Sequence, residues 1–253
     1  MAATRDPRPR SQQIAAELRA DIMSGDLPPG SQLPSTADLA ATYQAPGATI
    51  QNAVAILKQE GYVEGQPGRG VFVRRTEQQT ITPADYGRPA EPGQPYAWIT
   101  VAAGRGQHGT SRLLDVGEVP APAQVAAAFG IDPGTPVVRR RQLLLLDGQP
   151  AELVHAYYPT DLARDTPLAD RRRLRGGSPA VLAALGVPPT SYEDTISTRP
   201  PTPEELIALD LPQGVPVLRT LRAAVAASGR TVEVLVLIKA GHRHQVMYRW
   251  PAG

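Results

Sequence analysis

The chain contains no cysteine, only two tryptophans and two phenylalanines, and no long apolar run. The absence of cysteine excludes disulfides, cysteine-ligated metals and thiol nucleophiles. No stretch approaches the roughly 18 consecutive apolar residues of a membrane span, and the first ten residues are polar, unlike a signal peptide. We therefore expect a cytoplasmic protein that has no membrane partner.

Signatures of catalysis and of cofactor or metal binding are also missing. The sequence has neither a Gly-x-Ser-x-Gly nor a His-Glu-x-x-His motif. His242 and His244 lack the further ligands that zinc requires. Residues 104–109 spell G-x-G-x-x-G after a predicted strand at 98–103, but a second strand follows them where a dinucleotide site needs a helix. We expect no catalytic residues, no metal and no cofactor.

The first 75 residues predict three helices and a hairpin. Apolar residues recur every four positions in a helix at 11–24, and Ser35 is a good N-cap for a short second helix. A third helix is expected at 48–60, and the glycine-rich run 62–73 reads as two strands around a turn. This order is typical of a winged helix-turn-helix.

In a winged helix-turn-helix, the start of the third helix enters the major groove of DNA. Gln51 and Asn52 are suited to pair with adenine, and Thr49 to touch a thymine methyl. Arg69, at the predicted tip of the wing, suits a narrow minor groove. The alternative is a small helical domain that binds no DNA, because a net charge of only +2 does not by itself indicate nucleic acid.

These residues resemble the GntR family of regulators. The match consists of GDLPPGSQLPS at 25–35, LAATY at 39–43, the third helix at 49–61 and GRGVFV at 68–73. The resemblance implies DNA contacts from the helix starts, the wing and the N-terminal arm: Arg10, Ser35, Thr36, Thr49, Gln51, Asn52, Arg69 and Gly70. Family members usually carry arginine at the positions of Ala37 and Gln51, so a different operator sequence is expected.

Beyond a Pro- and Gly-rich segment, the chain contains a duplication. Residues 131–139 match 211–219 at an offset of 80, and each copy lies between a helical stretch and two strands joined by a Gly turn. We therefore predict a winged-helix domain at 1–76, a linker at 77–95 and a second domain at 96–253. The fold class is α+β, and the second domain is one antiparallel sheet with helices on one face. The alternative is chance similarity between two Pro-Gly turns.

The second domain resembles the UTRA sensor domain of the HutC subfamily of GntR regulators, which is related in fold to chorismate lyase. The resemblance rests on the repeated Gly-x-Pro-Val turn, the Asp-Gly-x-Pro turn at 147–150, Tyr-Tyr-Pro at 157–159, TPEE at 202–205 and Val-Glu at 232–233. It implies a repressor that binds a palindromic double-stranded operator as a homodimer and is modulated by a small-molecule effector.

Strand alternation places Arg140 and Gln142 on one face, beside Glu152 across the hairpin. The second copy supplies Glu233 and Lys239. These five residues are the candidate effector contacts, although an exposed strand edge is the alternative for Arg140 and Lys239. The Arg-x-Arg pair of sugar-phosphate-sensing members falls at Gln142 and Leu144, which argues against a phosphosugar. The alternatives to an effector-controlled repressor are a constitutive repressor with a dimerisation scaffold and a chorismate lyase-like enzyme.

Overall fold

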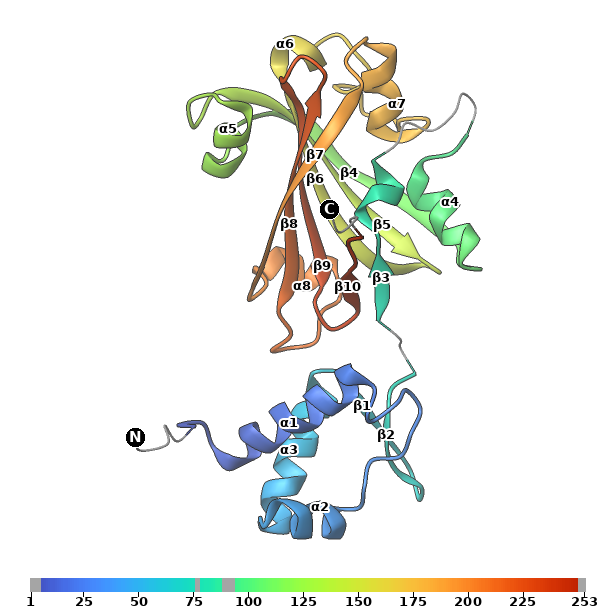
Figure 1. Cartoon of the computed structure of the whole chain (residues 1–253), viewed down its shortest axis with the longest axis vertical. Coiled ribbons are helices and arrows are strands. Elements are labelled where there is room, and N and C mark those ends of the chain that lie inside the picture. The colour runs from blue at the N-terminus through green and yellow to red at the C-terminus, as the bar shows by residue number, and fades with distance from the viewer. Residues whose placement is uncertain (1–5, 76–77, 88–93, 250–253) are drawn as a thin grey trace. The chain divides into compact units, whose positions relative to one another are not determined.

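The computed structural model describes residues 6–75, 78–87 and 94–249. The chain forms two compact units, Met1–Gln78 with Pro212–Val215 and Gln79–Leu211 with Pro216–Gly253 (Figure 1). Both units mix helices with antiparallel strands, which confirms the predicted α+β class.

The first unit contains the three predicted helices and the hairpin. Its elements are α1 (Arg10–Ser24), α2 (Thr36–Tyr43), α3 (Gly47–Gln59), β1 (Val63–Gln66) and β2 (Gly70–Val73). Each helix contributes buried apolar residues at helical spacing to one core, among them Ile14, Leu39 and Ile50. Because Pro9 precedes α1, that helix begins at Arg10 and has no side-chain cap, whereas Ser11 would be the natural cap from sequence alone. Gly25, in the left-handed conformation, ends it.

The hairpin is held against the loop between α1 and α2. Gln32 bridges to Phe72, the amide of Leu33 donates to the carbonyl of Val71, and the amide of Val73 donates to that of Ser31. Gly70 has a φ of +112°, and a Cβ there would lie 2.7 Å from Nε2 of Gln32. The wing therefore requires glycine at position 70.

The second unit is built on one six-stranded antiparallel sheet of order β4-β5-β6-β9-β8-β7. The strands are β4 (Gly109–Pro120), β5 (Pro136–Leu146), β6 (Gln149–Pro159), β7 (Pro189–Arg199), β8 (Val217–Ala226) and β9 (Thr231–Ala240). The duplicated units are β4-α5-β5-β6 and β7-α8-β8-β9, with α5 at Ala123–Phe129 and α8 at Pro203–Ala208. They meet where β6 pairs with β9, so the sheet has an approximate internal twofold.

Helices cover both faces of this sheet, not one face as predicted. Val234, Val236 and Ile238 of β9 pack into a core with α5 and the end of α8. On the opposite face, Leu237 packs with Trp98 and Ala102 of α4 (Ala97–Gly104). The short α6 (Thr160–Ala163) and α7 (Gly177–Ala184) contribute to a further core on this second face. Figure 1 shows α4 and α5 on opposite sides of the sheet.

Two local predictions are wrong. Residues 98–103, predicted as a strand, belong to α4. Part of the predicted linker is ordered within the second unit, because β3 (Gln79–Ile81) pairs in parallel with β10 (His244–Val246) and a 3-10 helix follows at Pro83–Tyr86. Residues 77 and 88–93 of that linker lie outside the described residues.

Candidate functional sites

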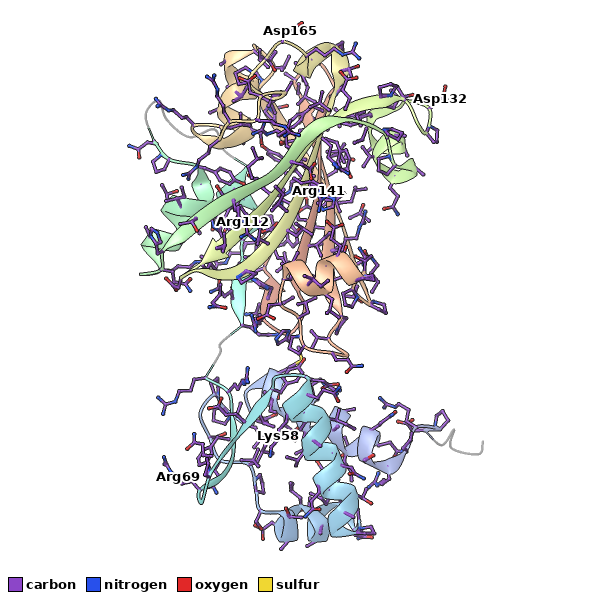
Figure 2. The ribbon with its side chains drawn as sticks, turned by 180° about the vertical axis from the view of Figure 1, so that it is seen from behind. Lys58, Arg69, Arg112, Asp132, Arg141 and Asp165 are labelled. Carbon is purple, nitrogen blue, oxygen red and sulfur yellow. The ribbon has the colours of Figure 1, made fainter. Side chains whose placement is uncertain are left out.

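The exposed face of α3 is the first candidate site. Ile50, Ala53 and Leu57 are buried, which turns Gln51 and Asn52 to solvent and leaves Thr49 half-buried. Lys58 lies two turns further along the face of Gln51 and is also exposed (Figure 2). Lys58 was not among the predicted DNA contacts, although its seven-residue spacing from Gln51 places both on one helix face.

A hollow in the first unit brings several predicted DNA contacts together. Its lining comes from α2, α3 and the wing and includes Ser35, Thr36, Gln51 and Gly70. Ser35 also has a structural role, because its Oγ accepts a bond from the amide of Asp38 and donates to the Asp38 carboxylate at 2.6 Å. This capping box fixes the start of α2.

Arg69 occupies the tip of the wing (Figure 2). Its amide closes the turn by donating to the carbonyl of Gln66, and its own carbonyl accepts a bond from Gln32. The guanidinium lies 5.6 Å from the ring centroid of Phe72. The backbone at this tip is therefore fixed, and the cation stays at the surface.

The N-terminal arm offers less free charge than its sequence implies. Arg10 donates to the carbonyl of Tyr43 at 3.1 Å and to Gln13, which ties the start of α1 to the end of α2. The charge of Arg8 is neutralised by Asp6 at 2.6 Å. Arg5 lies outside the described residues.

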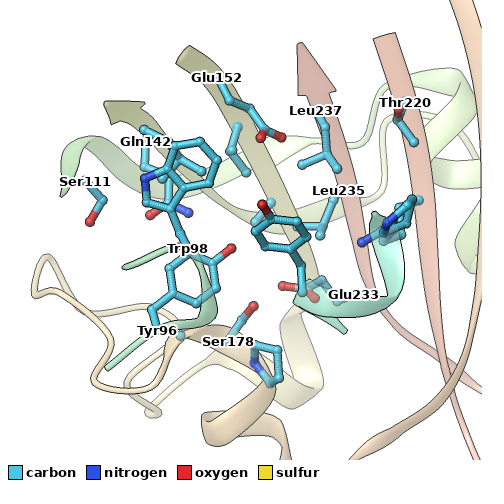
Figure 3. A pocket seen from close by; sticks show the side chains of 18 of the residues that line it. Tyr96, Trp98, Ser111, Gln142, Glu152, Ser178, Thr220, Glu233, Leu235 and Leu237 are labelled. Atoms are coloured by element: carbon cyan, nitrogen blue, oxygen red, sulfur yellow. The ribbon is translucent and has the colours of Figure 1, made fainter. Parts of the chain in front are cut away.

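The second unit contains a pocket on the face of the sheet that α4 and α7 cover (Figure 3). Its cavity volume is about 100 Å³. Alternate residues of neighbouring strands line it, as the strand periodicity of two requires. All five predicted effector contacts are among them: Arg140, Gln142, Glu152, Glu233 and Lys239.

Two ion pairs lie in the pocket wall. Nζ of Lys239 is 2.9 Å from Oε1 of Glu152, across the β6–β9 register, and both side chains are less than a tenth exposed. Arg222 holds Asp194 through two bonds of 2.7 and 2.8 Å. Each charge thus offsets much of the cost of burying its partner.

Arg222 and Asp194 were not among the predicted effector contacts. The duplication could have indicated Arg222, because Arg222 corresponds to Gln142 at the offset of 80 residues. Asp194 lies opposite Arg222 on β7, and only the strand register reveals this pairing.

Glu233 is held differently from the carboxylates of these two ion pairs, Glu152 and Asp194. It is 1% exposed, and its Oε1 accepts a bond of 2.7 Å from the hydroxyl of Tyr158. The hydroxyl of Ser178 also bonds to it. Burial nevertheless raises the pKa of the Glu233 carboxyl, because desolvation outweighs these bonds and the nearby charge of Arg222.

Arg140 is committed to the backbone of a loop. Its guanidinium donates to the carbonyls of Pro167, Leu168, Asp170 and Arg172 at 2.6–3.3 Å. That loop leads through Arg173 into α7, which carries Ser178. Arg140 therefore positions one wall of the pocket, and neither of the two sequence interpretations, an exposed edge or a free ligand contact, describes it fully.

Half of the chain's twelve aromatic residues line this pocket. The sequence has eight tyrosines and two tryptophans. Five of those tyrosines and one tryptophan line the pocket: Tyr86, Tyr96, Tyr158, Tyr192, Tyr248 and Trp98. Trp98 donates from its indole nitrogen to the carbonyl of Leu145, which fixes the ring.

Metal and membrane features are not found in the described part of the chain. No group of three or more His, Asp or Glu residues there has metal-binding geometry. His244 is buried with its Nδ1 3.1 Å from the carbonyl of Ala240, and burial lowers its pKa to about 4. No helix among the described residues combines the length and the apolarity that a bilayer crossing demands.

Comparison with known families assigns both units. Residues 10–73 match the family described as bacterial regulatory proteins, gntR family, and residues 104–245 match the UTRA domain. An HTH-type transcriptional regulator of Rhizobium meliloti is 30% identical over 225 residues, 88% of this chain and 87% of that protein. One of Streptomyces coelicolor is 29% identical, covering 95% and 92%. The HTH-type transcriptional repressor NagR of Bacillus subtilis is 22% identical, covering 96% and 95%.

Solved structures agree with this assignment. The crystal structure of a putative GntR-family transcriptional regulator is 26% identical with a TM-score of 0.67, covering 97% of this chain and 99% of that one. PhnF from Mycobacterium smegmatis shares the fold, with a TM-score of 0.59 at 21% identity and coverage of 95% and 100%. The chain is a transcriptional regulator of the GntR family, with a helix-turn-helix domain joined to a UTRA domain as in the HutC subfamily.

Proposed function

We propose that this regulator is a homodimeric repressor whose affinity for a palindromic operator is set by a small molecule bound in the pocket of its UTRA domain. The pocket carries the proposal. Four of the six strands contribute buried polar side chains to it: Arg140, Glu152, Thr220, Arg222, Glu233 and Lys239. Burying such groups costs free energy unless they are paired, so a purely structural scaffold would gain little from them.

Three further points support this function. NagR, which covers nearly the whole chain, is named a repressor. A single winged helix contacts little DNA, whereas a dimer reads two half-sites about 10 base pairs or a multiple apart. Since a repressor acts on the chromosome, we place the protein in the cytoplasm.

We also propose that the UTRA domain senses its ligand and does not transform it. Incubation of the protein with a bound small molecule should return the molecule unchanged. A product detected by mass spectrometry would favour the lyase-like alternative.

Base readout is proposed for Thr49, Gln51 and Asn52, and backbone contact for Arg69, Arg10, Ser35, Thr36 and Gly70. The experiment is a binding titration against an operator selected from random duplexes. Gln51→Ala or Asn52→Ala should cost about 1–3 kcal/mol and relax preference at one position of each half-site. Arg69→Ala should weaken binding to all DNA sequences alike. It should also reduce the slope of log affinity against log salt concentration by about 1.

Gln12→Ala is the matched control, because Gln12 is exposed on α1 and lies outside the α2–α3–wing hollow. Light scattering of the complex gives its stoichiometry. A monomer on a non-palindromic site, or the same sequence-independent loss for Gln51→Ala and Arg69→Ala, would contradict the proposal.

A further inference from the structure

The pocket is elongated and has two different polar ends. On β9 the residues that face it are Glu233, Leu235, Leu237 and Lys239. Six residues of strand span about 20 Å. Two leucines thus separate a carboxylate at one end from the Lys239–Glu152 pair at the other. Figure 3 shows Glu233 directed toward Ser178, with Leu235 and Leu237 between it and Glu152.

The cations of the lining already have partners or face water. Lys239 is paired with Glu152, Arg222 with Asp194, and the donors of Arg140 are used by four carbonyls. Arg173 is exposed, where solvent screens its charge. A phosphate or carboxylate entering the buried part would therefore meet no uncommitted cation among the described residues.

Glu233 shows the opposite imbalance. Among the described lining residues it is the buried carboxylate without a salt-bridge partner, since its bonds come from the hydroxyls of Tyr158 and Ser178. A buried carboxylate gains most from a cation that arrives with its own hydrogen-bond donors. An ammonium group on a ligand has that chemistry.

The aromatic lining favours the same ligand. Aromatic faces attract organic cations, and sites that bind ammonium groups are commonly aromatic cages. Figure 3 shows the hydroxyl of Tyr96 directed into the pocket, with Trp98 beside it. Leu235 and Leu237 then provide an apolar floor for the remainder of the molecule.

We propose that the pocket binds an organic ammonium ion, an amine carried on an apolar body, with its nitrogen at the Glu233 carboxylate. This inference rests on the proposed function only in taking the pocket as the effector site. It names the ligand by charge and shape: positive at one end, apolar along β9 and without a phosphate.

The test uses three probes of one shape: 3-phenylpropylamine, 3-phenylpropan-1-ol and 3-phenylpropanoate, with inorganic phosphate as a fourth. Binding is followed by fluorescence of Trp98 in the full-length Trp250→Phe variant, which leaves Trp98 as the single tryptophan. We expect the amine to bind at least tenfold more tightly than the alcohol, and the carboxylate and phosphate more weakly still.

Glu233→Gln removes the charge and keeps an oxygen that can accept the bond from Tyr158. In this variant the amine should lose its advantage while the alcohol binds as before. The inference would be overturned if the alcohol, the carboxylate or phosphate bound to the wild type as tightly as the amine or more tightly. It would also be overturned if the preference for the amine survived in Glu233→Gln, or if none of the four probes bound. The comparison of the four probes on the wild type tests the inference even if the Glu233→Gln variant fails to fold.

Failure of the proposed function is measured separately. Operator titrations without any probe test the DNA-binding part. If the amine binds and operator affinity does not move, the ligand class stands and effector control of DNA binding fails.

Discussion

The Lys239–Glu152 pair gives a sharp test of what a buried charge is worth in this sheet. Lys239→Met leaves Glu152 buried without its cation, which should cost about 3–5 kcal/mol in unfolding free energy. Lys239→Met with Glu152→Leu should recover most of the loss, because replacing both partners by apolar groups is often nearly neutral. Denaturant unfolding measures each variant.

The control for this cycle is Arg230→Ala. Arg230 pairs with Asp161 at 2.7 Å, but their side chains are 47% and 67% exposed. Its loss should cost less than about 1 kcal/mol. If Lys239→Met cost no more than Arg230→Ala, the burial of the inner pair would have no energetic consequence.

Glu233 predicts a pH dependence of the opposite sign to an ordinary ion-paired carboxylate. Burial raises its folded-state pKa above the unfolded value. Its favourable contribution is therefore complete below the unfolded pKa and is lost as pH rises through the folded pKa. Glu233→Gln, which carries no charge at any pH, should raise Tm above wild type at pH 8 and match it near pH 4. Equal Tm differences at both values would contradict this.

Two elements of the fold carry the same capping box, which separates stability from DNA contact. Ser35 caps α2 with Asp38, and Thr202 caps α8 with Glu205. Ser35→Ala and Thr202→Ala should each cost about 1 kcal/mol of stability. Only Ser35→Ala should also weaken operator binding, since Thr202 belongs to the UTRA domain. Parallel losses of DNA affinity in the two variants would mean that Ser35 acts through stability alone.

The elements that the sequence predicts well are those with clear start and stop residues, such as glycine and proline. Gly25 caps the end of α1, Pro46 and Gly61 follow the ends of α2 and α3 within three residues, and the apolar positions recur at helical spacing. α4 lacks these signals. Its β-branched run, Ile99 to Val101, favours a strand, but Trp98 and Ala102, one turn apart, both pack under the sheet. The burial of these side chains against the sheet, and not the local β propensity, therefore makes this segment helical.

At the scale of the whole chain, the sequence duplication predicted the order of helix, turn and strands in each half of the UTRA domain. The duplication did not predict that β6 pairs with β9, because no turn connects these two strands. That pairing joins the two halves of the pocket. It brings Glu152 within 2.9 Å of Lys239 although 87 residues separate them. The helices of the second face were not predicted, although α4 and α7 also lie 80 residues apart.

The largest-scale prediction is that ligand and operator affect each other's binding equally. If a pocket ligand changes operator affinity, the two sites share a coupling free energy, typically 1–3 kcal/mol or about 5–150-fold. Linkage then requires that saturating operator change the ligand affinity by the same factor and in the same direction.

Two titrations check this reciprocity: operator binding with and without saturating 3-phenylpropylamine, and Trp98 fluorescence with and without operator. Glu233→Gln should shrink both factors toward one together, because it removes the ligand's anchor without touching the first unit. A constitutive repressor would show a factor of one in both titrations of the wild type. Unequal factors would mean that the probe competes at the DNA surface or that the dimer dissociates during the assay. Light scattering distinguishes these cases, because only dissociation changes the mass of the complex.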